Sequence, residues 1–236
     1  MSNKTLSVVL PCYNPDKNWA VNILIRYNEI ARLLPNYHFE VILVNDGSSR
    51  NIDSELQKLK TEISNCQVVN YITNKGKGYA IREGVKNATG DFIVYTDVDF
   101  PYTNQSFVQI VEGLNEADIT IGTRGTSYYQ NIPLHRAFIS KLLKFLIKAS
   151  LRIPTNDTQG GLKGMRNSAK QLFLKTEINR YLFDLEFVCL AAKNKQQIKL
   201  IPVVLNEQTV VRKMNLKVVS KEMINFFKLY AKMVFS

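Results

Sequence analysis

The sequence predicts an α/β fold in which a mostly parallel central sheet is flanked by helices. The chain has 236 residues, of which 45% are hydrophobic, so it is long enough to bury a core without disulfide bonds. Short apolar runs alternate with stretches whose apolar residues recur at helical spacing. Because the resulting order is a repeated β-α-β, we expect parallel pairing through right-handed crossovers.

The first half of the chain contains four expected strands and three expected helices in alternation. Apolar residues recur at helical spacing from Trp19 to Leu34, between Pro15, where a helix can start, and Pro35, where this one ends. The expected strands are 6–11, 39–44, 67–72 and 92–99, and the expected helices are 19–34, 53–63 and one that follows 74–78. Parallel sheets bind ligands beyond the carboxyl ends of their strands, so we expect a site in the loops after these strands.

The fourth apolar run ends on two carboxylates, Asp97 and Asp99. Side chains alternate on extended backbone, so we expect the two to point the same way. Two hard oxygen ligands at the end of a parallel strand can hold Mg²⁺ or Mn²⁺ and leave coordination positions for a diphosphate. The pattern predicts a cation site for a nucleotide-linked substrate; the alternative is a strand that ends in solvated Asp side chains.

Polar motifs also follow the first three strands, and one crevice would collect them with the acidic pair. Each motif alone could be an ordinary turn or helix cap. The chain lacks the glycine-rich fingerprints of dinucleotide and P-loop sites, so we expect a different nucleotide. The candidate residues are Pro11, Tyr13 and Asn14 after the first strand, Asn45 and Asp46 after the second, and Gly76 and Lys77 after the third.

Charge is unevenly distributed along the chain. The net charge is +11, but residues 1–123 carry 11 basic and 14 acidic side chains, whereas residues 124–236 carry 20 and 6. A basic half is compatible with nucleic acid, an anionic membrane or a phosphorylated substrate.

Three separated cysteines, Cys12, Cys66 and Cys189, fit a reduced compartment. No apolar run suits a signal peptide or a spanning helix, so we expect a cytoplasmic chain.

Taken in order, the motifs resemble those of the family 2 glycosyltransferases with the GT-A fold, and among them the polyprenyl-phosphate (dolichyl-phosphate-type) sugar transferases. The similar segments cover nearly the whole chain. They are Pro11-Cys-Tyr-Asn, Val44-Asn-Asp-Gly-Ser, Asn74-Lys-Gly-Lys-Gly-Tyr-Ala, Asp97-Val-Asp, Ile121-Gly-Thr-Arg, Asp157-Thr-Gln-Gly-Gly-Leu-Lys-Gly, Phe183-Asp-Leu-Glu and Ile201-Pro-Val. The resemblance implies a Rossmann-like GT-A fold and an inverting, metal-dependent transfer of a hexose from a nucleotide sugar to a polyprenyl phosphate.

The resemblance also implies roles at the donor site. Asp99 would bind Mg²⁺ or Mn²⁺, and Asp97 would support the ribose and the metal. A cation is needed because breaking the anomeric bond puts negative charge on the leaving nucleoside diphosphate. Lys213 lies in a segment similar to a family loop that reaches the donor phosphates. The loops that would surround the base and ribose carry Pro11, Tyr13, Asn14, Asn45 and Asp46.

For the acceptor, arginine is more informative than a general base. Arg124 follows an expected strand at 119–122 and Arg136 opens the next helical stretch, and the guanidinium fork suits phosphate. Surface ion pairs or packing are the alternative for both. The resemblance implies that Asp157 positions or deprotonates the acceptor, and Gln159 and Lys163 lie in the same motif.

Two amphipathic helices are expected in the basic half, at 136–152 and near the C-terminus. Both suit an anionic bilayer surface, although packing on the domain or on a second subunit is the alternative. We expect a GT-A domain over 1–205, in which residues 1–123 bind the nucleotide sugar and residues 124–205 bind the acceptor, followed by a basic loop and helix over 206–236. The expected location is peripheral, at the inner face of the cytoplasmic membrane, with a homo-oligomer or a membrane-protein partner left open.

Two other functions stay open at this point. The same donor site could serve transfer to a saccharide hydroxyl in surface-polysaccharide synthesis. A basic nucleic-acid-binding domain would instead present aromatic side chains among Lys and Arg and would not need Asp99. The motifs favour the transferase, with no nucleic acid as partner, and leave both guanosine and uridine donors possible.

Overall fold

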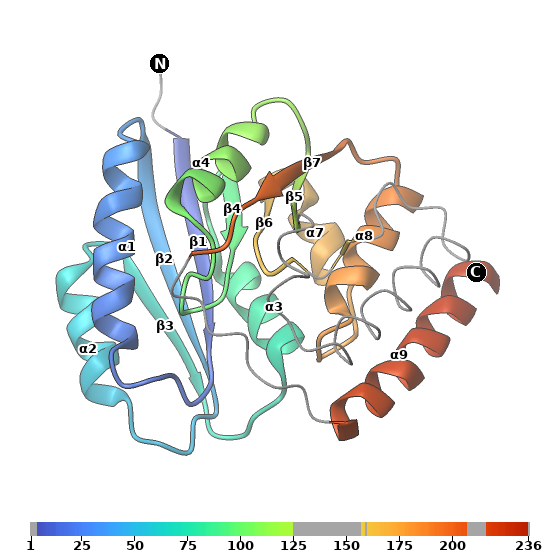
Figure 1. The fold of residues 1–236 in the computed structure, drawn as a ribbon, viewed down its shortest axis with the longest axis horizontal. Coiled ribbons are helices and arrows are strands. Elements are labelled where there is room, and N and C mark those ends of the chain that lie inside the picture. Colours follow the sequence, from blue (N-terminus) through green and yellow to red (C-terminus); the bar gives the residue numbers. More distant parts are fainter. Residues whose placement is uncertain (1–3, 125–156, 159, 207–215, 236) are drawn as a thin grey trace.

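The computed structural model describes residues 4–124, 157, 158, 160–206 and 216–235 of the chain (Figure 1). Seven of its strands form one sheet, in the order β3-β2-β1-β4-β6-β5-β7. The strands are β1 (Lys4–Cys12), β2 (Tyr37–Asp46), β3 (Cys66–Tyr71), β4 (Phe92–Tyr95), β5 (Ile119–Arg124), β6 (Lys163–Arg166) and β7 (Ile198–Val203). The first four pair in parallel, as the sequence predicts. β6 runs antiparallel to both β4 and β5, which makes the sheet mixed but mostly parallel.

Helices cover both faces of this sheet (Figure 1). They are α1 (Trp19–Leu33), α2 (Asp53–Glu62), α3 (Lys77–Asn87), α4 (Asn104–Gly113), α7 (Asn167–Leu174), α8 (Phe183–Lys193) and α9 (Leu216–Phe235). Apolar residues of α1, α2 and α4 share one buried cluster with the sheet. Those of α3, α7 and α8 share the other. The predicted layered α/β architecture is confirmed.

Burial on both faces explains the continuous apolar runs of the sequence. On β1, Val8 and Leu10 join the cluster under α1, whereas Val9 between them joins the cluster under α3. All three are at most 4% exposed. A strand that is covered on both sides has no solvent face and therefore no polar alternation.

The helix expected near the C-terminus is present as α9, but its apolar stripe is divided. Phe226 and Leu229 are buried against residues at the start of α8, whereas Ile224 and Phe227 are exposed. One side of the helix therefore packs on the protein, which was the alternative to a bilayer surface. No helix within the described residues is long and apolar enough to cross a bilayer. The other expected amphipathic helix, at 136–152, lies outside the described residues.

Candidate functional site

The acidic pair lies in a turn rather than on a strand. β4 ends at Tyr95, and the backbone N–H of Phe100 donates to the carbonyl oxygen of Asp97 at 2.9 Å, which closes a tight turn. The expectation that alternation on a strand aligns Asp97 and Asp99 is therefore wrong, since the extended backbone ends before them. Asp97 is half-buried and Asp99 is exposed.

Lys77 and Asp97 form an ion pair at this edge of the sheet. The distance from Nζ of Lys77, the first residue of α3, to Oδ1 of Asp97 is 2.5 Å. Burial opposes the charge on Lys77, but Asp97 and then Asp184 outweigh it and raise the pKa of Lys77 above its ordinary value. The backbone of Gly161 lies against the same carboxylate, because a Cβ at that position would be 2.7 Å from Oδ2 of Asp97. The structure thus brings together two predicted donor-site residues and the segment after Asp157.

A buried ionic network lies next to this pair and includes a residue predicted for the acceptor. Lys163 is fully buried, and its Nζ lies 2.8 Å from Oδ1 of Asp184 and donates to the carbonyl oxygen of Gly160 at 2.5 Å. Tyr95 donates to the same carboxylate at 2.6 Å. Burial lowers the pKa of Lys163 and outweighs the opposing effect of Asp184. The expectation that Lys163 meets the acceptor phosphate is corrected, since its ammonium group is enclosed in the core.

Arg124 and Asp157 form a second buried pair. The backbone N–H of Arg124 donates to Oδ2 of Asp157 at 2.7 Å, and its Nη2 and Nε donate to Oδ1 at 2.6 and 3.2 Å. The side chains are only 10% and 5% exposed. The sequence suggested separate roles for these residues, but the structure makes them one unit in which Asp157 orients the guanidinium group.

Asp46 organises the loop after β3. It is 3% exposed, and its carboxylate accepts hydrogen bonds from Tyr71 Oη at 2.8 Å, Asn74 Nδ2 at 2.8 Å, and the backbone N–H groups of Lys75 at 2.8 Å and Gly76 at 3.0 Å. A carboxylate that accepts this many bonds holds the loop in place. Asp46 thus links the motifs that follow β2 and β3.

The motif after β1 is held to the loop after β2. Asn14 adopts a positive φ of 45°, and its side-chain oxygen accepts from the backbone N–H of Ser49 at 3.0 Å. Asn45 holds the same loop through Ser48, whose N–H donates to Oδ1 of Asn45 at 3.0 Å. Pro11 is half-buried, and Tyr13 beside Asn14 is 49% exposed. Tyr13 is thus the exposed side chain of this motif.

Gly76 and Gly78 allow the backbone of residues 178–180 to approach α3. A Cβ at Gly76 would lie 2.5 Å from the carbonyl oxygen of Asn179, and one at Gly78 would lie 2.5 Å from that of Ile178. The carbonyl oxygen of Asn179 accepts from the backbone N–H of Gly78 at 2.8 Å and occupies the amino end of the helix. The glycine requirement at Gly76 thus comes from its positive φ of 104° and from packing within the protein.

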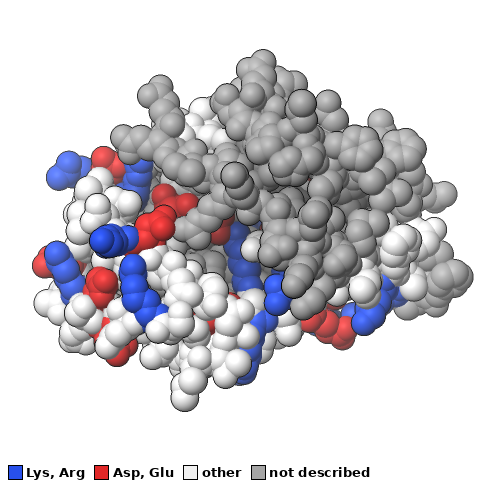
Figure 2. Space-filling view, turned by 60° about the horizontal axis from the view of Figure 1, so that its bottom comes forward, with Lys and Arg blue, Asp and Glu red and all other residues white. Residues whose placement is uncertain are grey.

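Three predicted residues, Arg136, Gln159 and Lys213, lie outside the described residues, so their expected roles stay predictions. Seen toward the carboxyl ends of the strands, acidic and basic side chains are interspersed over the described part of the surface (Figure 2).

Residues 7–173 match the protein-family model described as glycosyl transferase family 2. The chain belongs to glycosyl transferase family 2. The resemblance inferred from the motifs is therefore confirmed.

Curated relatives of this family 2 chain include sugar transferases. The chain is 30% identical over 217 residues to a dolichyl-phosphate beta-glucosyltransferase of Trichomonas vaginalis, covering 86% of this chain and 66% of the relative. It is 29% identical over 204 residues to the dolichyl-phosphate beta-glucosyltransferase of Homo sapiens, covering 80% and 63%. The chain thus spans slightly less than two thirds of the length of these relatives.

Solved structures with the same fold include two synthases. The mannosyl-3-phosphoglycerate synthase from Rubrobacter xylanophilus matches with a TM-score of 0.70 at 14% identity, and the match covers 97% of this chain and 73% of the synthase chain. The glucosyl-3-phosphoglycerate synthase from Mycobacterium tuberculosis, in complex with Mn²⁺, uridine diphosphate and glucosyl-3-phosphoglycerate, has a TM-score of 0.65 at 15% identity and covers 98% and 80%. The likeness confirms the predicted GT-A fold.

Three buried residues to which the sequence assigns no role, Tyr102, Asp184 and Glu186, bond to segments of the candidate site of this family 2 protein. Tyr102 is 7% exposed, and its hydroxyl accepts from the backbone N–H of Gly161 at 3.1 Å. Burial raises the pKa of Tyr102 to about 12, so the hydroxyl stays neutral. Asp184 and Glu186 belong to the Phe183-Asp-Leu-Glu segment, which the sequence indicated only as a similarity. Their burial, at 4% and 1% exposure, could not be read from the sequence.

The carboxylates of the acidic turn fit a cation that is shared with a substrate. Within the described ranges, no group of three or more His, Cys, Asp and Glu side chains is arranged to hold a metal. Asp97 forms an ion pair with Lys77, and Asp99, two residues further along the chain, is exposed. Mg²⁺ is usually bound by one or two carboxylates with substrate phosphates and water, which this turn can accommodate. It does not fit a cage made of protein ligands alone.

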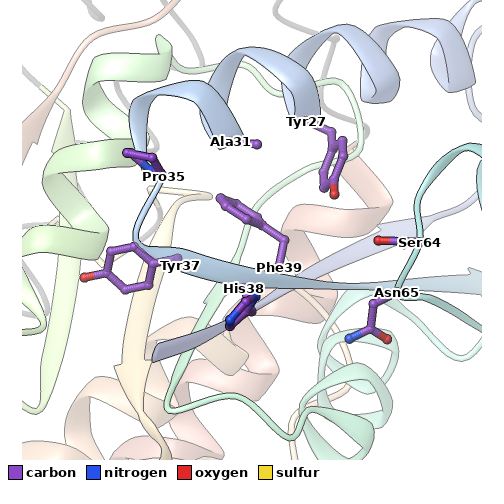
Figure 3. A pocket seen from close by; sticks show the side chains of 8 residues that line it. All are labelled: Tyr27, Ala31, Pro35, Tyr37, His38, Phe39, Ser64 and Asn65. Carbon is purple, nitrogen blue, oxygen red and sulfur yellow. The ribbon is translucent and has the colours of Figure 1, made fainter. Parts of the chain in front are cut away.

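A pocket of about 380 Å³ lies at the amino end of β2 (Figure 3). Tyr37, His38 and Phe39 line it at the amino end of β2, with Tyr27 from α1. Because sheets of this kind bind ligands beyond the carboxyl ends of their strands, we assign it no role in the site.

Proposed function

We propose that this chain is an inverting, metal-dependent glycosyltransferase that moves a hexose from a nucleotide sugar, of the GDP-mannose or UDP-glucose type, to a polyprenyl phosphate. The observation that carries this proposal is the 30% identity, over 86% of the chain, to a dolichyl-phosphate beta-glucosyltransferase. Formation of a beta product from an alpha-linked nucleotide sugar requires inversion at the anomeric carbon. The proposed product is a lipid-linked monophosphoryl sugar.

The donor would bind at the carboxyl ends of the first four strands. Tyr13 and Asn14 would flank the base and ribose, and Asp99 with Asp97 would hold Mg²⁺ or Mn²⁺. When bound, the cation would neutralise the charge that develops on the leaving diphosphate. Lys77, whose raised pKa keeps it protonated, adds a fixed positive charge at the same place.

In the proposed reaction, an oxygen of the acceptor phosphate bonds to the anomeric carbon while the bond from that carbon to the diphosphate oxygen breaks. The electron pair leaves with the nucleoside diphosphate. The acceptor phosphate is mostly ionised near neutral pH, since its second pKa is about 6, so no base has to remove a proton. Asp157 is therefore not needed as a base, and its carboxylate is instead bound by Arg124. Arg124 would attract the acceptor phosphate, with Arg136 and Gln159 as further candidates.

We further propose that the protein acts at the inner face of the cytoplasmic membrane as a peripheral protein. A polyprenyl phosphate presents its phosphate at the surface of the bilayer. Exposed Ile224 and Phe227 on α9, together with the excess of basic residues after residue 123, are suited to an anionic lipid surface. Lys213, which precedes α9 in the sequence, would reach the donor phosphates.

The test is a transfer assay with UDP-glucose and GDP-mannose, Mg²⁺ or Mn²⁺, and a polyprenyl phosphate in detergent. A saccharide acceptor without phosphate serves as the comparison. Asp99→Asn removes the proposed cation ligand, and Asp91→Asn is the matched control, because exposed Asp91 precedes β4 at the opposite end of the same strand.

We expect one donor to give a sugar-phosphate lipid with the parent and with Asp91→Asn, and no turnover with Asp99→Asn. Transfer to the saccharide alone would overturn the acceptor half of the proposal. No use of either nucleotide sugar would overturn the whole proposal.

A further inference from the structure

The backbone of residues 176–180, here called the capping segment, closes the amino end of α3. The carbonyl oxygen of Asn179 accepts from the backbone N–H of Gly78 at 2.8 Å and of Tyr79 at 3.3 Å. These N–H groups belong to the first turn of the helix and have no partner inside it. The capping segment therefore fixes the position of the residues at which α3 begins.

Arg82 clamps the capping segment from the side of α3. Its Nη1 donates to the carbonyl oxygen of Ile178 at 2.9 Å and to Oγ1 of Thr176 at 3.4 Å, and its Nη2 donates to Oδ1 of Asn179. Helix and segment thus meet through both backbone and side-chain hydrogen bonds, and a displacement of one displaces the other.

Glu186 also holds the capping segment. It lies on α8 and is 1% exposed, and its Oε2 accepts from the backbone N–H groups of Glu177 and Ile178, each at 2.8 Å. Hydrogen bonds of this kind to an ionised acceptor are stronger than neutral ones. A buried carboxylate thus determines the path of the chain just before Asn179.

The helix end fixed in this way carries Lys77, whose Nζ lies 2.5 Å from Oδ1 of Asp97. Lys77 lies between Gly76 and Gly78, the two positions at which a Cβ would strike the capping segment. On these contacts, we propose that Glu186 is a positioning residue, which sets Lys77 against Asp97 through the capping segment and so tunes the affinity for the nucleoside diphosphate. The inference rests on the proposed function.

The same carboxylate connects the donor site to α9. Lys232 of α9 lies 2.9 Å from Oε2 of Glu177 and 3.6 Å from Oε1 of Glu186. The C-terminal helix therefore packs on the element that positions Lys77. Lys232→Met should therefore reproduce part of the effect of Glu186→Ala. Its loss of nucleotide affinity should be smaller, because the side chain of Lys232 is partly exposed in both pairs.

The test measures the Kd of UDP and of GDP with Mn²⁺ by calorimetry, together with the Tm of each variant. Glu186→Ala removes the acceptor of both backbone N–H groups, and Glu186→Gln keeps an acceptor oxygen. Glu40→Ala is the matched control: Glu40 is also 1% exposed and accepts from the backbone N–H of Thr89 at 2.9 Å, but it lies toward the amino end of β2.

We expect Glu186→Ala to weaken nucleotide binding about tenfold, as loss of one charge-assisted contact would. Glu186→Gln should stay within about threefold of the parent, since it can still bond the segment. Glu40→Ala should lower the Tm and leave the Kd unchanged. The decisive comparison is made in a Lys77→Met background, where Glu186→Ala should have no further effect on the Kd.

An equal loss of affinity from Glu186→Ala with and without Lys77 would overturn the inference, because the effect would not pass through Lys77. So would an unchanged Kd in folded Glu186→Ala. If that variant does not fold, Arg82→Met tests the same link from α3, and an unchanged Kd there has the same meaning. Failure of the parent to bind either nucleotide would instead overturn the proposed function, and the inference with it.

Discussion

Gly161→Ala should separate the activity of this protein from its stability. A Cβ at Gly161 would lie 2.7 Å from Oδ2 and 3.6 Å from Cγ of Asp97, with Nζ of Lys77 next at 3.7 Å. All three atoms belong to side chains, and Asp97 is 40% exposed, so the carboxylate can move away. It must retreat by about 0.7 Å to reach ordinary van der Waals contact at 3.4 Å.

The cost to stability should be small. Gly161 has no positive φ that alanine would strain. Replacing glycine at such a position stabilises a protein by about 0.4–1 kcal/mol through the unfolded chain. Weakening the partly exposed pair with Lys77 costs up to about 1 kcal/mol. The free energy of unfolding should therefore stay within about 1 kcal/mol of the parent value.

The effect on turnover should be much larger, because a misplacement of about 1 Å at a reacting centre can cost about 100-fold in rate. The assay is kcat/KM for the nucleotide sugar together with urea unfolding. At the neighbouring position, Gly160→Ala should instead lower the free energy of unfolding by about 1–3 kcal/mol, because its Cβ would strike the backbone carbonyl oxygen of Gly122. Full activity of Gly161→Ala would refute the placement of Asp97 at the reacting centre.

Three further changes test other features of the site and fold. Lys163→Met leaves the buried carboxylate of Asp184 without its cation and should lower the free energy of unfolding by about 3–5 kcal/mol in urea; a loss below about 1 kcal/mol would contradict this. Burial raises the pKa of Glu222, so the stabilising contribution of its protonated side chain is present below the ordinary carboxyl pKa and is lost as the pH rises through the raised value. The Tm of Glu222→Gln should therefore fall less than the Tm of the parent between about pH 4 and pH 7, and identical pH profiles would contradict this. Arg124→Lys cannot reproduce the fork that grips Asp157 and should raise the KM for polyprenyl phosphate about tenfold; an unchanged KM would remove Arg124 from the acceptor site.

The order of the elements could be predicted from the sequence because β1, β2 and β4 contain continuous buried apolar runs, and turn residues follow all four strands of the first half, including the partly buried edge strand β3. The structure places those strands at Lys4–Cys12, Tyr37–Asp46 and Cys66–Tyr71, within a few residues of the prediction. The fourth strand is shorter than predicted. Its apolar run does not reveal where extended backbone gives way to a turn, and the turn begins at Asp97.

The partners of the site residues could not be predicted, because they come from distant segments of the chain. Arg124 and Asp157 are 33 residues apart, and Lys163 meets Asp184 across the fold. Sequence spacing identifies each side chain as chemically suitable but does not reveal which of them form ion pairs with each other. In the same way, Gly76 looks like a residue of a ligand loop until the backbone of Asn179 is seen against it.

The proposed function requires the turn after β4 to hold a divalent cation together with a nucleoside diphosphate. The most direct measurement is the free Mn²⁺ signal in electron paramagnetic resonance, recorded as the parent, Asp99→Asn and Asp91→Asn are titrated with UDP or GDP. With one of the two nucleotides, the parent and Asp91→Asn should remove more Mn²⁺ from solution than the nucleotide removes alone, and Asp99→Asn should not. Equal uptake by Asp99→Asn and the parent would contradict it.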